Sequence, residues 1–180
     1  MRAKDALRRA ALSQRSGLTA ADRRAAGSAL ALGLHDVVTR ADRVAAYAAL
    51  GSEPPTAEVL GLCREVLLPV LLPDGDLDWA VASELVAATR SLLEPTGPRL
   101  GADALATCDV VLVPALAVDR SGNRLGRGGG SYDRALRRAT GLTVALLYDG
   151  EVAEALPAEP HDVKVAAVAT PSYGLVHLPG

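Results

Sequence analysis

The 180-residue sequence has no phenylalanine, and aromatic residues make up only 3% of it. Leucine, valine and alanine must therefore fill the hydrophobic core. Long apolar runs are also absent. The longest, Val110 to Val118, contains Pro114 and falls well short of the roughly 20 residues that a membrane-spanning helix needs. These absences exclude a helical membrane protein, and we expect no membrane partner.

Cysteine and excess charge are scarce as well. Cys63 and Cys108 have neither the close spacing of a metal site nor the number required for a disulfide framework. A net charge of -2 provides no basic field, so we expect no nucleic-acid partner. The amino-terminal segment is charged from its second residue and lacks the apolar stretch of a secretory signal, which favours a cytoplasmic protein. The 19 basic residues include only two lysines, Lys4 and Lys164, so a lysine at a functional position is noteworthy.

Periodicity and turn signals divide the chain into alternating strands and helices. Helices are predicted over 4–15, from an N-cap at Thr19 to about Leu34, after an N-cap at Thr56, and over 132–140. Strands are predicted over 43–50, 67–72, 109–114, 143–148 and 163–169, with a weaker candidate at 77–83 and a loop at 94–98. This alternation predicts a single α/β domain over residues 1–180. We expect a three-layer sandwich with a mostly parallel central sheet and flanking helices.

The most informative segment is the glycine-rich run RLGRGGGSYD, from Arg124 to Asp133, which lies between the best strand and a helix. Its glycines expose backbone amides and permit positive φ, the geometry of an anion-binding nest. Arg124 and Arg127 add forked donors that match phosphate oxygens, and the following helix adds further free amides. A flexible loop could have the same composition. The strand, the helix and the two arginines together favour phosphate binding.

Two aspartates extend this hypothesis to a metal. Asp133 would lie in the first turn of the helix, where a carboxylate ordinarily does no more than complement the helix dipole. Beside a bound polyphosphate it would face like charge, and a divalent cation between them would resolve the conflict. Mg²⁺ commonly binds one or two carboxylates together with substrate phosphates. Asp162 precedes another predicted strand and is a candidate second ligand, although alone it would be an ordinary loop aspartate.

The chain resembles the 5-formyltetrahydrofolate cyclo-ligase family. The likeness is carried, in the family's order, by Lys4 with Leu7-Arg8, Glu53-Pro54-Pro55-Thr56, Glu94-Pro95, DVVLVPALAVDRSGNRLG, RLGRGGGSYD and His161-Asp162. Ser131 departs from the tyrosine of many members, and Arg127 and Gly129 stand where some members have a lysine or tyrosine. The resemblance implies ATP- and Mg²⁺-dependent cyclisation of 5-formyltetrahydrofolate to 5,10-methenyltetrahydrofolate. ADP and phosphate would be released through a phosphorylated formyl intermediate.

The resemblance also implies roles for individual residues. ATP would contact Lys4, Arg8, Arg124, Leu125, Gly126, Arg127, Gly128, Gly129, Gly130, Ser131 and Tyr132. The folate would border Ala48, Glu53, Arg127, Gly128, Gly129, Gly130 and Ser131, with Glu53 hydrogen-bonded to the pterin. Arg124 and Arg127 would stabilise the transferred phosphate during catalysis, while Asp133 and Asp162 would hold Mg²⁺.

Two other functions compete with this interpretation. One is a non-catalytic nucleotide-binding module on the same fold, against which Glu53 argues because such a module needs no pterin ligand. The other is a sugar-phosphate isomerase or transferase on a similar scaffold, for which no convincing acid/base pair lies near the loop. His161 is expected to be structural rather than a base, and Trp79 and Tyr47 are expected in the core rather than at a cofactor. We expect the protein to act as a monomer.

Overall fold

The computed structural model describes residues 2–83, 85–87 and 93–179. Its main sheet has seven strands in the order β12-β11-β9-β6-β1-β2-β3. The inner strands β11, β9, β6, β1 and β2 run parallel, while the edge strands β12 and β3 are antiparallel to their neighbours. The strands are β1 (Val44–Ala45), β2 (Val66–Leu71), β3 (Leu77–Val81), β6 (Val110–Pro114), β9 (Leu142–Leu146), β11 (Ala167–Thr170) and β12 (Gly174–His177).

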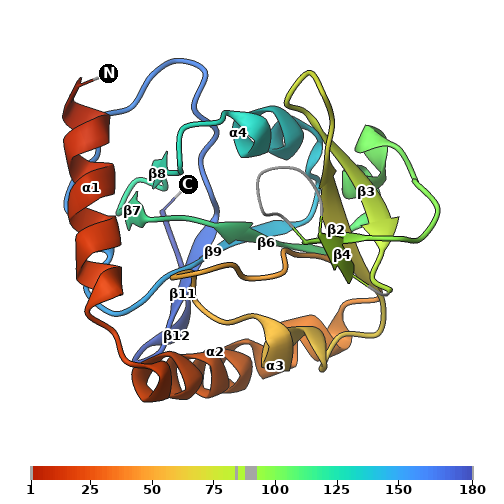
Figure 1. Ribbon diagram of the computed structural model, residues 1–180, viewed down its shortest axis with the longest axis horizontal. Coiled ribbons are helices and arrows are strands. Elements are labelled where there is room, and N and C mark those ends of the chain that lie inside the picture. Colours follow the sequence, from red (N-terminus) through yellow and green to blue (C-terminus); the bar gives the residue numbers. More distant parts are fainter. Residues whose placement is uncertain (1, 84, 88–92, 180) are drawn as a thin grey trace.

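Helices cover both faces of this sheet (Figure 1). In β6, Val110 and Leu112 pack into the core beneath α2 (Ala20–Arg40) and α3 (Ala57–Leu60). Val111 and Val113 alternate with them and pack into a second core on the opposite face. That face is covered by α4 (Ser131–Ala135) and the 3₁₀ helices η2 (Ala102–Thr107) and η3 (Leu136–Arg138). The predicted three-layer sandwich with a mostly parallel sheet is confirmed.

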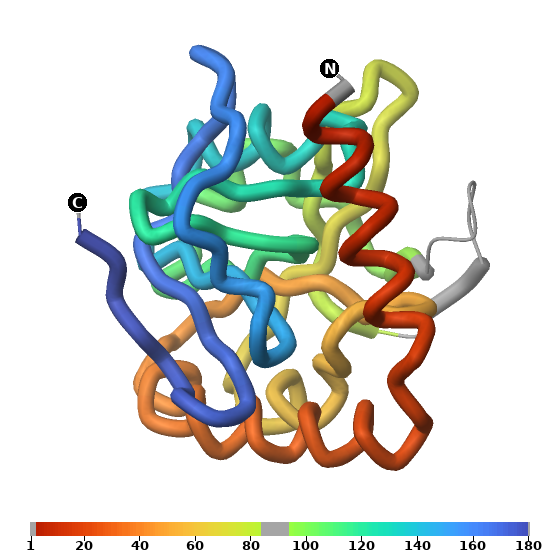
Figure 2. Tube along the Cα trace, turned by 90° about the vertical axis from the view of Figure 1, so that its left-hand side faces the viewer, coloured from red at the N-terminus to blue at the C-terminus, as the bar shows by residue number. Residues whose placement is uncertain are grey.

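The first helix, α1 (Arg2–Ser16), lies outside these layers and runs along one side of the molecule toward α2 (Figures 1 and 2). It packs near a small sheet of β10 (Val152–Ala153), β7 (Ala117–Asp119) and β8 (Arg124–Leu125). Its Ala11 is buried with Leu116 and Leu125 in a hydrophobic cluster separate from the two main cores. Polar side chains of α1 also hold this helix against the rest of the protein, and they are described with the site below.

Several element boundaries differ from those predicted. Helix α2 begins with the expected N-cap at Thr19, which forms a capping box with Asp22, but the helix continues past Leu34 to Arg40. It does so because Leu34 and Val38 are both fully buried against the sheet. The predicted strand 43–50 pairs only at Val44–Ala45, since residues beyond position 46 leave the ladder toward the cavity described below.

Three further segments complete the comparison. The predicted helix 132–140 is α4 followed by the tighter η3. Part of the predicted loop 94–98 belongs to a strand instead, because β5 (Leu93–Pro95) pairs with β4 (Leu85–Ala87). Trp79 is fully buried in β3, as predicted for a core residue.

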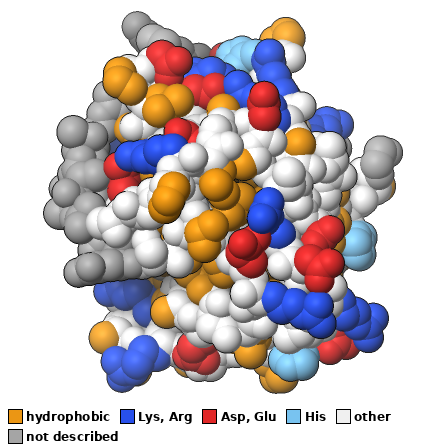
Figure 3. Space-filling model, turned by 90° about the vertical axis from the view of Figure 1, so that its right-hand side faces the viewer, with side chains coloured by type: hydrophobic (Ala, Val, Ile, Leu, Met, Phe, Trp, Pro, Cys, Tyr) orange, Lys and Arg blue, Asp and Glu red, His pale blue; other side chains and the backbone are white. Residues whose placement is uncertain are grey.

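On the side of the molecule opposite α1, hydrophobic side chains gather near the middle with charged groups around them (Figure 3).

Candidate active site

A cavity of about 640 Å³ opens beside the carboxyl ends of β1, β2 and β6. The chain order reverses here, because β2 lies on one side of β1 and β6 on the other. Open α/β sheets bind ligands at such a switch point, outside the carboxyl ends of the strands. Helix α1 and the glycine-rich segment form further walls. Every residue assigned a site role from the sequence lines this cavity: Lys4, Arg8, Ala48, Glu53, Arg124 to Tyr132, Asp133 and Asp162.

The glycine-rich segment forms the wall between β8 and α4. Gly128 and Gly130 adopt φ of +98° and +70°, which side chains rarely tolerate. A Cβ atom on Gly128 would lie 3.1 Å from the guanidinium carbon of Arg8, and one on Gly130 would lie 3.2 Å from Arg134. Arg8 also donates from Nε to the carbonyl oxygen of Gly126 over 2.8 Å. The loop therefore has a defined path, held against α1 and α4.

One face of α1 supplies basic side chains to the cavity. Lys4, Arg8 and Arg15 are spaced four and seven residues apart, and all three line it. The Nζ atom of Lys4 donates to Asp162 Oδ2 over 2.6 Å. Burial alone would raise the pKa of Asp162, but hydrogen bonds from Lys4 and the Glu159 amide outweigh it and leave that pKa lowered. Lys4 thus has a buried acidic partner rather than a solvated position.

Arg124 and Asp133 form a second pair inside the cavity. Arg124 Nη2 lies 3.1 Å from Asp133 Oδ1, and the Arg124 side chain is only 4% exposed. The Val163 amide also donates to Asp133 Oδ1, over 3.3 Å. The Arg124 guanidinium lies 5.8 Å from the centre of the Tyr132 ring. The buried Arg124 Nε and the Tyr132 hydroxyl have no hydrogen-bond partner among the described residues.

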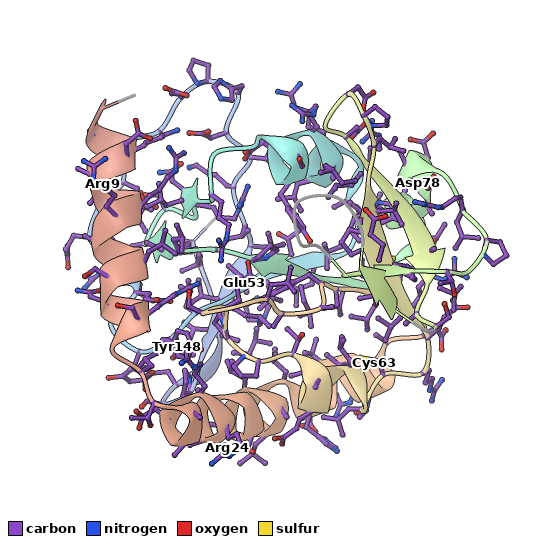
Figure 4. The ribbon with its side chains drawn as sticks, viewed as in Figure 1. Arg9, Arg24, Glu53, Cys63, Asp78 and Tyr148 are labelled. Atoms are coloured by element: carbon purple, nitrogen blue, oxygen red, sulfur yellow. The ribbon has the colours of Figure 1, made fainter. Side chains whose placement is uncertain are left out.

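Glu53 lines the cavity too, and it lies near the middle of the molecule (Figure 4). Its carboxylate accepts a hydrogen bond from the Leu50 amide over 3.0 Å and lies 3.3 Å from Arg127 Nε. The Tyr148 hydroxyl donates to the backbone carbonyl of Glu53 over 3.1 Å and so fixes the loop from beneath. Apolar residues also line the cavity: Ala48, Leu50, Pro69, Leu71, Leu77 and Leu116. Together with a carboxylate they suit a flat ring with polar edges.

Two residues that were expected to be structural lie in or beside the cavity. Tyr47 is buried, in agreement with a core assignment, yet it also lines the cavity. His161 is exposed and lies 3.3 Å from Glu159 and 3.7 Å from Asp162. The side chains of Glu159, His161 and Asp162 lie close enough together to bind a cation.

Arg15, which lines the cavity, forms a buried ion pair with Glu151 that was not predicted from the sequence. Arg15 donates from Nε and Nη2 to the two carboxylate oxygens of Glu151, each over 2.7 Å. Arg15 Nη2 also donates to the Ala115 carbonyl over 2.6 Å, and the guanidinium lies over the Tyr148 ring. The partners are 136 residues apart in the chain, so local spacing carried no signal of their contact.

Comparison with known proteins identifies the family. The model of the 5-formyltetrahydrofolate cyclo-ligase family matches residues 1–171. The chain belongs to that family. A 5-formyltetrahydrofolate cyclo-ligase of Mycolicibacterium smegmatis is 42% identical, with 98% of each chain covered. The Escherichia coli protein of the same name is 34% identical over 68% of this chain and 72% of its own.

Solved structures agree with this assignment. The NMR structure of Aquifex aeolicus 5,10-methenyltetrahydrofolate synthetase matches with a TM-score of 0.84 at 26% identity, covering 98% of this chain and 93% of that one. A 5,10-methenyltetrahydrofolate synthetase from Mycoplasma pneumoniae shares the fold, with a TM-score of 0.73 at 19% identity over 92% and 96% of the two chains. The resemblance noted from the sequence is confirmed, and the chain is a ligase of this ATP-dependent family. No helix among the described residues is long and apolar enough to cross a membrane.

Proposed function

We propose that this protein uses ATP and Mg²⁺ to cyclise 5-formyltetrahydrofolate to 5,10-methenyltetrahydrofolate, releasing ADP and phosphate. One observation carries the proposal beyond family membership. A single cavity combines a basic, glycine-rich wall with apolar lining residues and the half-buried carboxylate of Glu53. The first suits a triphosphate and the second suits a pterin, so both substrates would meet in one enclosed space.

The basic wall fits the phosphates of ATP. Lys4, Arg8 and Arg124 bring charge from two distant segments of the chain, and Gly128 and Gly130 leave backbone amides free of shielding side chains. The unpartnered Arg124 Nε offers a further donor at the same wall. Arginine forks and backbone amides are the donors that phosphate groups prefer. The residues present therefore fit a bound triphosphate.

Asp133 and Asp162 are our proposed ligands for Mg²⁺. Carboxylate oxygens beside a phosphate site are the donors that this ion accepts. When bound, the ion would neutralise charge on the phosphates. In the structure the two carboxylates pair with Arg124 and Lys4 instead. Their charges are thus balanced by protein groups that themselves suit phosphate.

Glu53 would orient the folate. Its acceptor oxygens match the N–H donors on the pterin edge, and its backbone is held by Tyr148. The formamide oxygen is a poor leaving group until the γ-phosphoryl group of ATP is transferred to it. The bridging nitrogen of the folate can then attack the formyl carbon, the ring closes as that nitrogen loses its proton, and phosphate leaves. Alignment of the two substrates and stabilisation of charge by Arg124 and Arg127 are the protein's contributions.

The decisive measurement is absorbance of methenyltetrahydrofolate formed by the purified protein. We expect product only when 5-formyltetrahydrofolate, ATP and Mg²⁺ are all present. Turnover without nucleotide would contradict the ligase mechanism, and folded protein that binds ATP without any turnover would favour the non-catalytic module.

The two buried or half-buried free cysteines, Cys63 and Cys108, suit a reducing compartment, and we propose a cytoplasmic location.

Substitution of the two aspartates tests the metal assignment. Asp133→Asn and Asp162→Asn should each require much more Mg²⁺ for half-maximal activity, because each removes an oxygen ligand. If both serve one ion, the double variant should lose less than the sum of the single losses. Activity is titrated against Mg²⁺ for the four proteins at saturating ATP. An unshifted Mg²⁺ dependence in both single variants would leave the ion to the nucleotide and water alone.

A further inference from the structure

The side chain of Tyr47 carries a buried hydroxyl that forms no hydrogen bond within the described part of the chain. The residue follows β1 directly, lines the cavity and is only 4% exposed. Its hydroxyl has no hydrogen-bond partner among the described residues. The neighbouring Tyr148 differs, because its hydroxyl donates to the Glu53 carbonyl. A buried hydroxyl without a partner destabilises a fold, and such a group in a ligand cavity indicates a partner supplied by the ligand.

The surroundings of Tyr47 favour a hydrogen-bond donor. Burial is the largest effect on the pKa of its hydroxyl, and the negative charge of Glu53 acts in the same direction. Arg15 opposes both effects, but the pKa remains well above its ordinary value. The phenol therefore keeps its proton throughout the neutral range. It can offer that proton to an acceptor placed beside Glu53.

We propose that the Tyr47 hydroxyl donates a hydrogen bond to the pterin of the folate, at the C4 carbonyl oxygen. This inference rests on the proposed function and adds a specificity-determining residue to it. The ionised Glu53 carboxylate can only accept hydrogen bonds, so it matches the amine and N3–H donors of the pterin edge. The carbonyl oxygen next to those donors needs a donor of its own. Tyr47, which lines the same cavity as Glu53, can supply one.

The proposal makes stability and binding change in opposite directions. Tyr47→Phe keeps the ring and removes only the unpartnered hydroxyl. Ligand-free protein should therefore melt at the same or a higher temperature. Binding of 5-formyltetrahydrofolate should weaken about three- to tenfold, the effect typical of one lost hydrogen bond. The KM for ATP should stay within about twofold, because the proposed contact of Tyr47 is with the pterin and not with a phosphate.

The experiment measures melting temperature, both KM values and the calorimetric Kd for 5-formyltetrahydrofolate without ATP. Tyr173→Phe is the matched control, since Tyr173 is 80% exposed and does not line the cavity. It should leave all four quantities unchanged. Failure of the parent protein to turn over would count against the proposed function, whereas the calorimetric comparison tests Tyr47 separately. Unchanged folate binding in Tyr47→Phe, or a lower melting temperature, would overturn the proposal.

A second measurement locates the acceptor. A folate analogue that carries an amino group in place of the C4 carbonyl oxygen removes the acceptor while leaving the hydroxyl in place. The parent protein should discriminate against this analogue more strongly than Tyr47→Phe does, by a factor close to the variant's own loss of folate affinity. Equal discrimination by the two proteins would mean that the hydroxyl does not contact that oxygen.

Discussion

The buried pair of Arg15 and Glu151 should dominate the stability of the junction between α1 and the sheet. Their side chains are 1% and 6% exposed, and two 2.7 Å hydrogen bonds join them. Glu151→Leu leaves the guanidinium buried without its carboxylate partner, which typically costs 3–5 kcal/mol, or about 4 kcal/mol here. With a denaturant slope of about 2 kcal/mol per molar, the urea midpoint should fall by about 2 M. Unfolding is followed by circular dichroism in urea.

Three further variants test the reasoning. Replacing both partners, Arg15→Leu with Glu151→Leu, should recover much of the loss, because no uncompensated charge remains buried. Glu151→Gln keeps one acceptor oxygen and should fall between the parent and Glu151→Leu. Glu154→Leu is the control, since its pair with Arg120 is 2.9 Å long but 84% and 73% exposed at the two side chains, and little change is expected. A loss below about 1 kcal/mol for Glu151→Leu, or strict additivity in the double variant, would refute the argument.

Three other changes have distinct expected outcomes. Gly130→Val should raise the ATP KM at least about tenfold. The control is Gly150→Val, because Gly150 has a similar positive φ but lies in open space, so this variant should share the backbone strain without the rise in KM. Equal KM values in the two variants would exclude the loop from nucleotide binding. Glu53→Gln should weaken folate binding by about 1–3 kcal/mol with ATP affinity nearly unchanged, and equal calorimetric losses for both ligands would contradict its role. Hydrogen bonds from Arg138 lower the pKa of Asp76, so this pair stabilises the fold at neutral pH and loses that effect as pH falls through the lowered pKa. Asp76→Asn should therefore be up to about 1 kcal/mol less stable than the parent at pH 7 and equal to it in strong acid, and a difference that is constant with pH in urea titrations would disprove this.

The layers of the fold were predictable because their signals are local. The unbroken apolar run of β6 indicates a strand buried on both faces, and its residues alternate between the two cores. The length of α2 was not predictable in the same way. Gly33, His35 and Asp36 weaken its local helical signal, but burial of Val38 against the sheet carries the helix on to Arg40. Tertiary packing decided the boundary where the local sequence was ambiguous.

The candidate site shows the same contrast between local sequence signals and contacts formed only on folding. The glycine-rich segment is contiguous, so its chemistry could be predicted from composition and order. The ion pair of Arg15 and Glu151 and the second role of Tyr47 could not, because both depend on segments that meet only in the folded chain. The expectation of a divalent cation between Asp133 and a bound polyphosphate stays a prediction. Opposite Asp133 the structure places Arg124, a cation that the sequence argument had assigned only to phosphate.

The pairing of charges across the cavity gives a physical reason to expect that ATP and Mg²⁺ act together. Each proposed phosphate-binding base has an acidic partner: Lys4 with Asp162, Arg124 with Asp133, Arg127 with Glu53, and Arg8 with Asp5. A triphosphate arriving alone would have to compete with Asp162 for Lys4 and with Asp133 for Arg124, and the displaced carboxylates would lie near its negative charge. If the carboxylates of Asp133 and Asp162 turn to a divalent cation, Arg124 and Lys4 become free to bind phosphate oxygens. The two ligands would then each remove the obstacle to binding the other, so the affinity for ATP should rise with Mg²⁺ by more than complexation in solution accounts for.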